Sequence, residues 1–159
     1  MLRTGRSSFV VLSALLAAPA AGPAAAADGP KVVSVTKIWD HGRHNAFTDL
    51  ARWRGQWYCA FREADGHVGG DGKIRLLESG DGRAWEPAAL IAEEGIDLRD
   101  PKLSVTPDDR LMLVAGGSVY RGTRTLMGRR PRVLFSRDGR RWTAPRPVLE
   151  EGEWLWRVT

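Results

Sequence analysis

The pattern S-x-D-G-x-x-W occurs twice, as Ser79-Gly80-Asp81-Gly82-Arg83-Ala84-Trp85 and as Ser136-Arg137-Asp138-Gly139-Arg140-Arg141-Trp142, with the two serines 57 residues apart. A Ser hydroxyl and an Asp carboxylate accept backbone N–H bonds within a turn, glycine adopts conformations that a side chain resists, and Trp packs back on the hairpin. We therefore predict structural turns, with a chemical role for either Asp as the weaker alternative. The predicted turn residues are Ser79, Asp81, Gly82, Trp85, Ser136, Asp138, Gly139 and Trp142.

Short apolar segments of strand character surround both copies in the same order. The first repeat, about 47–92, predicts strands at 50–53, 57–61, 74–78 and 88–92. The second repeat, about 102–149, predicts strands at 102–105, 111–115, 133–135 and 148–149, and a third repeat begins at about 154. Helical periodicity is absent after residue 27, so the sequence predicts an all-β fold.

The N-terminal stretch is typical of a secretory signal peptide. Arg3 and Arg6 precede an apolar run at 9–18, and an Ala-rich tract follows up to Ala27. We predict cleavage after Ala27, which leaves 28–159 as the exported β domain, periplasmic or extracellular. The run of about ten apolar residues is shorter than the roughly 17 to 25 that span a bilayer, so no membrane insertion is expected.

Composition excludes several classes of protein. Hydrophobic residues make up 43% and charged residues 27% of the chain, which is typical of a globular protein and not of a disordered or collagen-like one. The single cysteine, Cys59, excludes an internal disulfide framework and a Cys-based zinc site. Acidic residues are interspersed among the basic ones, so we expect no nucleic-acid partner despite the formal charge of +5.

The two turns resemble the Asp-box, or BNR, repeats of the sialidase (neuraminidase) superfamily. The segments Asn45-Ala46-Phe47-Thr48-Asp49-Leu50, Cys59-Ala60-Phe61-Arg62-Glu63 and Leu98-Arg99-Asp100-Pro101-Lys102-Leu103 also resemble bacterial exported sialidase-like proteins. The resemblance implies a six-bladed β-propeller with four antiparallel strands per blade. About two blades and the start of a third are present, so we expect an N-terminal fragment with exposed strand edges, inactive by itself.

Strand alternation predicts where binding groups lie. The first-to-second and third-to-fourth turns share one end of the sheets, and the longer connections share the other. These longer connections are predicted at 41–47, 62–73, 93–100, 116–130 and 150–156. Long loops on a rigid scaffold usually carry the binding residues, so we place the site at that end.

The resemblance implies a set of site residues there. Arg62, Arg99 and Arg157, with Asp100, are the implied substrate-binding residues, since guanidinium groups suit a sugar carboxylate. Scaffold ion pairs with Glu63, Asp100 or Glu153 are the alternative for these arginines. Asp71, or alternatively Asp65, is the implied acid/base, although each adjoins a glycine and suits a simple turn.

Two functions follow as expectations. The first is an exo-α-sialidase-type glycoside hydrolase acting on sialic acid or another anionic glycan; the second is a non-catalytic carbohydrate-binding or scaffold propeller. Ala46-Phe47-Thr48 replaces the R-I-P-like motif of the family, and Tyr120 is in the wrong blade for the family's nucleophile. No cofactor is expected. No metal is expected either, because His41, His44 and His67 with nearby carboxylates lack an established ligand spacing. Trp154 and Trp156 either stack on a sugar or fill the core between blades, and for Trp156 we expect the core.

Overall fold

The computed structural model describes residues 29–69, 72–122 and 124–158, in two units, Met1–Val35 and Thr36–Thr159. In the first unit, residues 29–35 are exposed and form no regular secondary structure. The predicted signal peptide, 1–27, lies outside the described residues. Within the part of the chain that is described, no helix is long and apolar enough to cross a membrane.

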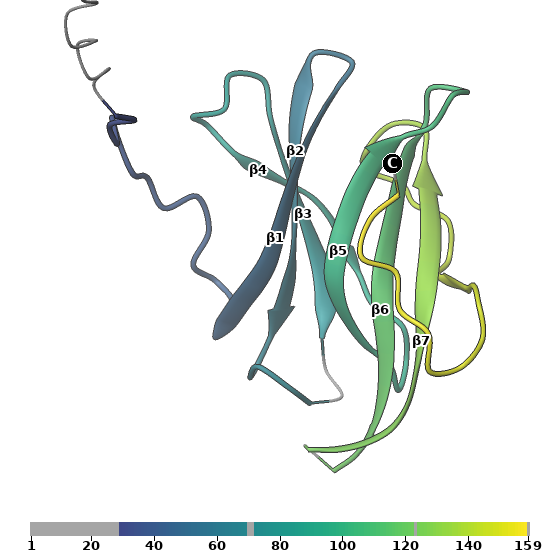
Figure 1. Ribbon diagram of the computed structural model, residues 1–159. Helices are drawn as coiled ribbons and strands as arrows, with labels where there is room; N and C mark the ends of the chain where they lie inside the picture. The colour runs from purple at the N-terminus through teal and green to yellow at the C-terminus, as the bar shows by residue number, and fades with distance from the viewer. Residues whose placement is uncertain (1–28, 70–71, 123, 159) are drawn as a thin grey trace, which may run out of the picture. The chain divides into compact units, whose positions relative to one another are not determined.

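The second unit contains two four-stranded antiparallel sheets in which the spatial order of the strands follows the chain (Figure 1). The first sheet comprises β1 (His44–Trp53), β2 (Gln56–Ala64), β3 (Lys73–Ser79) and β4 (Glu86–Ile91). The second comprises β5 (Asp97–Val105), β6 (Leu111–Arg121), β7 (Thr125–Ser136) and β8 (Arg146–Pro147). The all-β prediction is confirmed, and each predicted strand has a counterpart, although β8 lies two residues earlier than predicted.

One predicted connection is wrong. The segment 116–130 was expected to be a loop, but β6 and β7 stay paired from Gly116↔Pro131 out to Arg121↔Thr125. The connection was placed there by strand alternation alone, whereas β-branched and aromatic residues within the segment, such as Val119 and Tyr120, favour a strand. The segment is therefore a long β-hairpin.

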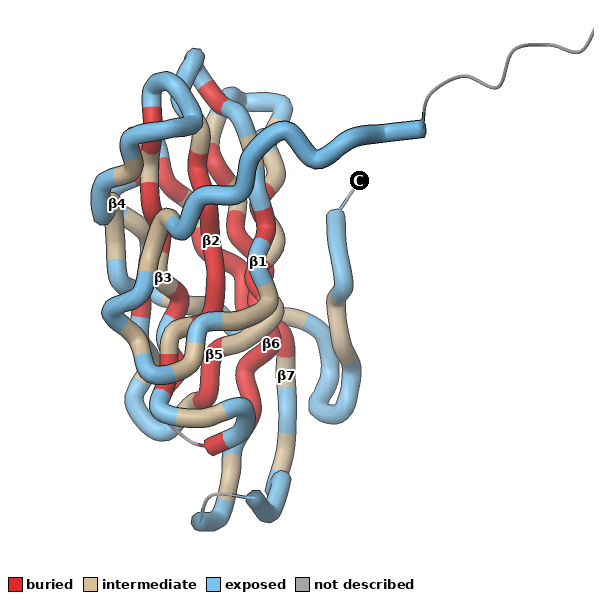
Figure 2. The backbone as a smooth tube through the Cα atoms, turned by 90° about the vertical axis from the view of Figure 1, so that its left-hand side faces the viewer, coloured by how far each residue is buried: buried red, intermediate tan, exposed pale blue. Residues whose placement is uncertain are grey.

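The main core lies between the two sheets, and Figure 2 shows buried residues along the strands of both. Ile74 and Leu76 of the first sheet belong to the same cluster as Leu111, Leu113 and Leu134 of the second. Burying a side chain of this size stabilises the fold by about 1.5 to 3 kcal/mol. The sheets are thus held face to face by ordinary apolar packing.

The opposite face of the first sheet is covered by the segment that precedes β1. Ile38 and Trp39 pack there against Cys59 and Phe61, and the Trp39 indole donates to Glu63 Oε2 at 3.0 Å. Burial raises the pKa of the Cys59 thiol to about 11. Cys59 is therefore a small buried apolar residue on β2, where it alternates with Trp57 and Phe61.

The two S-x-D-G-x-x-W turns connect β3 to β4 and β7 to β8 with matching hydrogen bonds. Ser136 Oγ accepts from the Gly139 amide at 2.8 Å, and Asp138 Oδ1 accepts from the amides of Arg140 and Arg141 at 3.0 and 2.8 Å. Trp142 Nε1 donates back to the Gly139 carbonyl at 3.1 Å. The turn at Ser79 repeats these contacts at 2.9, 2.8, 2.9 and 3.1 Å. The side chains of each motif thus provide hydrogen-bond partners for the backbone amides and a carbonyl of the same turn.

Candidate functional site

The sheets have two ends of different construction. One end, here the turn rim, contains the β1–β2, β3–β4, β5–β6 and β7–β8 turns. Arg54 of the first turn donates there to Asp109 Oδ2 at 2.9 Å and to the Arg137 carbonyl at 3.0 Å, which joins three turns. The other end, here the loop rim, contains the ends of β2, β4 and β6 and the connections that follow them. Of the predicted binding residues, Arg62 near the end of β2 and Arg99 and Asp100 near the start of β5 lie at the loop rim.

A pocket of about 370 Å³ opens at the loop rim of the second sheet. Its walls are β5, the β6–β7 hairpin and the segment after β8. The Trp154 ring lies directly on Gly116, where a Cβ atom would fall 1.9 Å from the ring, so glycine is required for this contact. The lining residues are Arg99, Asp100, Ser118, Tyr120, Leu126, Arg129, Trp154 and Trp156.

A β-bulge directly after Arg99 accompanies the placement of its side chain in the pocket lining. The β5–β6 register shifts between Arg99 and Lys102, and Asp100 has a φ of 49°. The β1–β2 register shifts at the matching place, and Phe47 has a φ of 62°. Left-handed conformations cost a non-glycine residue roughly 1 to 2 kcal/mol, and bulges commonly re-aim side chains beside functional sites. The two bulges meet, because the Arg99 guanidinium lies 4.9 Å above the Phe47 ring.

The pocket contains more positive than negative charge. Arg99 Nη1 donates to the Tyr120 hydroxyl at 3.3 Å, and Arg99 Nε lies 3.5 Å from Asp100 Oδ2. Arg129 donates to the Gly152 carbonyl at 3.2 Å and lies 5.8 Å from the Trp154 ring centroid. Two guanidinium groups therefore face one carboxylate, which favours an anionic ligand. Trp156 is 70% exposed, so the expectation that it fills the core is wrong, and its ring adds apolar surface at the mouth.

Arg62 does not line this pocket. Its side chain is fully buried, with Nε donating to Asp97 Oδ1 at 2.8 Å and Nη1 to the Gly66 carbonyl at 2.6 Å. A Cβ atom on Gly72 would fall 1.8 Å from the same Asp97 oxygen. The pair therefore joins β2, the β2–β3 connection and β5. The predicted alternative for Arg62, an ion pair with Glu63, is wrong, because neighbouring residues of a strand face opposite sides of the sheet.

Glu63 pairs on its own side of the sheet instead. Arg75 donates to both Glu63 carboxylate oxygens, at 3.0 and 3.1 Å. The hydrogen bond from Arg75 is the main cause that lowers the pKa of Glu63.

Arg157 also lies outside the pocket lining. It donates to Asp49 of β1, whose other oxygen accepts from the Leu103 amide at 2.8 Å. Lys102 approaches Asp49 at 3.9 Å. Asp49 is buried, and this group of contacts joins β1, β5 and the C-terminal segment. Of the three predicted arginines, only Arg99 reaches the pocket, and Asp100 accompanies it.

The proposed acid/base residues are placed only in part. Asp71 lies outside the described residues. Asp65 is exposed in the connection after β2. The rings of His44 and His67 pack edge to face at 5.4 Å, and among the described residues no three His, Cys, Asp or Glu side chains are grouped to hold a metal.

Sequence reasoning missed the contribution of the β6–β7 hairpin. Ser118 pairs with Arg129 and Tyr120 with Leu126, so these four side chains share one face and line the pocket. The signal was present as strand propensity in 118–121 and 125–130, but the segment was interpreted as a loop.

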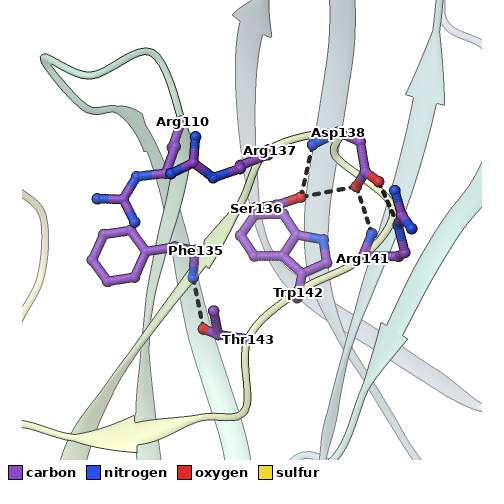
Figure 3. A pocket seen from close by; sticks show the side chains of 8 residues that line it. All are labelled: Arg110, Phe135, Ser136, Arg137, Asp138, Arg141, Trp142 and Thr143. Carbon is purple, nitrogen blue, oxygen red and sulfur yellow. Dashed lines mark hydrogen bonds and ion pairs between the residues drawn. The ribbon is translucent and has the colours of Figure 1, made fainter.

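A second pocket, of about 350 Å³, lies at the turn rim beside Trp142 (Figure 3). Its polar groups mostly bond to one another. Asp138 accepts from Arg141 Nε at 2.7 Å, the Phe135 amide donates to Thr143 at 3.1 Å, and Arg110 pairs with Asp108 at 2.7 Å. This pocket is a by-product of the turn and offers a ligand few free groups.

Comparison with known proteins supports the fold alone. No protein-family model and no curated protein matches the chain. A solved structure of a protein of unknown function from Dyadobacter fermentans is 24% identical with a TM-score of 0.53, covering 64% of this chain and 35% of that one. A protein described as a putative glycoside hydrolase, from Parabacteroides distasonis, is 21% identical with a TM-score of 0.46, covering 64% and 32%. The chain thus spans about a third of the length of these two structures.

Proposed function

We propose that the pocket around Arg99 binds an acidic sugar, and that the complete protein is an exported sialidase-like glycoside hydrolase acting on sialic acid or another anionic glycan. In this proposal the two sheets are blades of a six-bladed propeller, and the S-x-D-G-x-x-W turns are its Asp boxes. The observation that carries the proposal is the pocket itself, in which Arg99 and Arg129 adjoin the indoles of Trp154 and Trp156.

Arg99 is the proposed carboxylate ligand. Phe47 below it and Asp100 beside it hold the guanidinium, whose side chain is 12% exposed. A carboxylate pairs well with the planar donors of such a group, and a neutral sugar leaves them unpaired. The exposed Trp156 ring packs against the apolar face of the sugar. The pocket therefore selects acidic over neutral sugars.

Hydrolysis requires a proton donor in addition. We assign this role to Asp71, with Asp65 as the alternative, on the connection between β2 and β3. The donor protonates the oxygen of the departing sugar as the glycosidic bond breaks. The Arg62–Asp97 pair supports this connection from below through the Gly66 carbonyl. No described residue is assigned as nucleophile.

The test uses the complete protein with 4-methylumbelliferyl sialoside, and calorimetric titration with N-acetylneuraminic acid. Arg99→Gln should lower both turnover and affinity at least tenfold, because a buried charged hydrogen bond is worth about 1.5 to 3 kcal/mol. Arg137→Gln, at the turn rim, is the matched control and should change neither. Failure of the wild-type protein to bind any acidic sugar would refute the proposal.

A non-catalytic carbohydrate-binding propeller is the second candidate. It is favoured by one observation: Asp100, the carboxylate in the lining of the pocket, lies 3.5 Å from Arg99 Nε and is thereby committed to an ion pair. Asp71→Asn and Asp65→Asn separate the candidates. Loss of turnover with retained sugar binding in either variant supports the hydrolase, and binding without turnover in the wild type supports the second candidate.

A further inference from the structure

The β6–β7 hairpin has an unusual charge. Residues 119–132 contain five arginines and no Asp or Glu. Arg132 is paired with Glu93 through two hydrogen bonds of 2.8 and 3.1 Å. The other four arginines form no ion pair with any described residue. They are Arg121, Arg124, Arg129 and Arg130.

The hairpin exposes these charges. β6 and β7 run on together beyond the start of β5 (Figure 1). Near the tip, Gly122 has a φ of 61°, and among the described residues no atom beyond Gly122 and its chain neighbours lies within 4 Å of the place its Cβ would take. Arg121 and Arg124 are exposed, while Arg129 and Arg130 are anchored to the Gly152 and Leu149 carbonyls through Nε. Glu151 borders the hairpin at Gly128 without forming an ion pair there.

The hairpin is continuous with the sugar pocket. Tyr120, Leu126 and Arg129 belong to both, so a glycan chain that leaves the pocket along this wall meets Arg124 and Arg121 next. At the turn rim, by contrast, Arg54, Arg110, Arg140 and Arg141 each have a carboxylate partner, while Arg83 and Arg137 form no ion pair with a described residue. Unpaired guanidinium groups beside a sugar pocket are suited to repeated carboxylate or sulfate groups.

We infer that the β6–β7 hairpin is an extended subsite that binds the internal anionic residues of an acidic polysaccharide whose terminal sugar occupies the Arg99 pocket. The inference rests on the proposed function of that pocket. It names the substrate class as a polyanionic glycan chain. A nucleic acid is disfavoured because Tyr120 is the one aromatic residue in 116–132, the arginine-rich part of the hairpin, and successive bases require stacking platforms.

The test compares N-acetylneuraminic acid with its α2,8-linked polymer, using surface plasmon resonance at several salt concentrations. The double variant Arg121→Ser/Arg124→Ser should bind the polymer about five- to tenfold more weakly, since each exposed charge pair contributes up to about 1 kcal/mol. Its salt dependence should also weaken, because fewer counterions are released. Affinity for the monomer should stay unchanged, since neither residue lines the pocket.

The matched control is Arg83→Ser/Arg137→Ser, which removes the same charge from exposed positions at the turn rim. Equal losses of polymer affinity in both double variants would overturn the inference, because bulk charge would then explain binding. Tighter binding of duplex DNA or of phosphatidylserine vesicles than of the polymer at equal ionic strength would also overturn it. A wild type that fails to bind the monomer contradicts the proposed function. A wild type that binds it, with polymer affinity unchanged in the hairpin variant, contradicts this inference alone.

Discussion

The turn rim and the loop rim differ in how completely their polar groups are used. At the turn rim, Arg54, Asp109 and Asp138 each make several hydrogen bonds to neighbouring turns or to their own turn. At the loop rim, Arg129 and Arg130 use one nitrogen each on a backbone carbonyl. The first arrangement stabilises the sheets, and the second leaves donors for a ligand.

The same amino acid therefore serves two purposes in one fold. An arginine whose donors are bonded within the chain contributes to stability and has few free N–H donors for a ligand. An arginine fixed by one contact has lost much of its conformational freedom and retains its charge, which favours binding. The predictions below test whether stability and binding separate between the two rims in this way.

Removal of the Asp97 carboxylate should have the greatest effect. Asp97→Ala removes the carboxylate that bonds Nε of the fully buried Arg62 guanidinium and should lower the free energy of unfolding by about 3 to 5 kcal/mol. Urea denaturation of the protein measures this. Arg54→Ala breaks an exposed pair at the turn rim and should cost about 1 kcal/mol or less. Similar losses of unfolding free energy in the two variants would contradict the distinction between the buried Arg62–Asp97 pair and the exposed Arg54–Asp109 pair.

Alanine substitution of two glycines with positive φ, one at the turn rim and one at the tip of the β6–β7 hairpin, compares how tightly the two places are packed. Gly139 has a φ of 76°, and an added Cβ would fall 2.3 Å from the buried Tyr58 ring. Gly139→Ala should therefore lower the free energy of unfolding by roughly 2 to 4 kcal/mol, from strain and overpacking together. Gly122→Ala meets strain alone and should cost about 1 to 2 kcal/mol. If thermal or urea denaturation ranks Gly122→Ala as the more damaging substitution, the hairpin tip is not open.

Local sequence patterns predicted the strands. The partner of Arg62 and the form of the pocket could not be predicted, because they depend on contacts between residues far apart in the sequence. The two S-x-D-G-x-x-W turns and the alternation around them were sufficient to locate all eight strands, because turn chemistry acts over a few residues, but not to predict the length of β6 and β7. The partner of Arg62, by contrast, is Asp97, 35 residues away on the other sheet. The pocket likewise depends on a bulge at Asp100 and on Trp154 folding back onto Gly116. Neither contact leaves a periodic signal in the sequence.

Acid should weaken the turn rim through Asp138. Backbone N–H donation from Arg141, followed by its side chain, holds the pKa of Asp138 well below the ordinary value. The carboxylate therefore stabilises the fold above its unfolded pKa of about 3.9, and this contribution is lost as pH falls through the lower folded pKa. Asp138→Asn should lose about 1 kcal/mol at pH 7, after allowance for exposure, and should show a shallower loss below pH of about 4.

The sugar affinity is the control for that variant. Asp138 lies at the turn rim, outside the lining of the Arg99 pocket, so binding of N-acetylneuraminic acid at pH 7 should be unchanged. Reduced affinity in Asp138→Asn with an intact fold, judged by circular dichroism, would show that the two rims are coupled.

The smallest effect is expected for Phe47→Leu, which tests how the loop rim holds Arg99. Leucine keeps an apolar side chain at the same left-handed position, so the backbone strain cancels in the comparison, but it lacks the aromatic ring that lies under the guanidinium. A cation–π contact at this exposure is worth about 0.5 to 1 kcal/mol, which predicts a two- to fivefold weaker affinity for the acidic sugar. The free energy of unfolding should change by less than about 1 kcal/mol. Affinity for a neutral sugar is the internal reference, because it does not depend on the guanidinium; equal losses for both sugars would mean that Phe47 acts through general packing, and not by orienting the charge of Arg99.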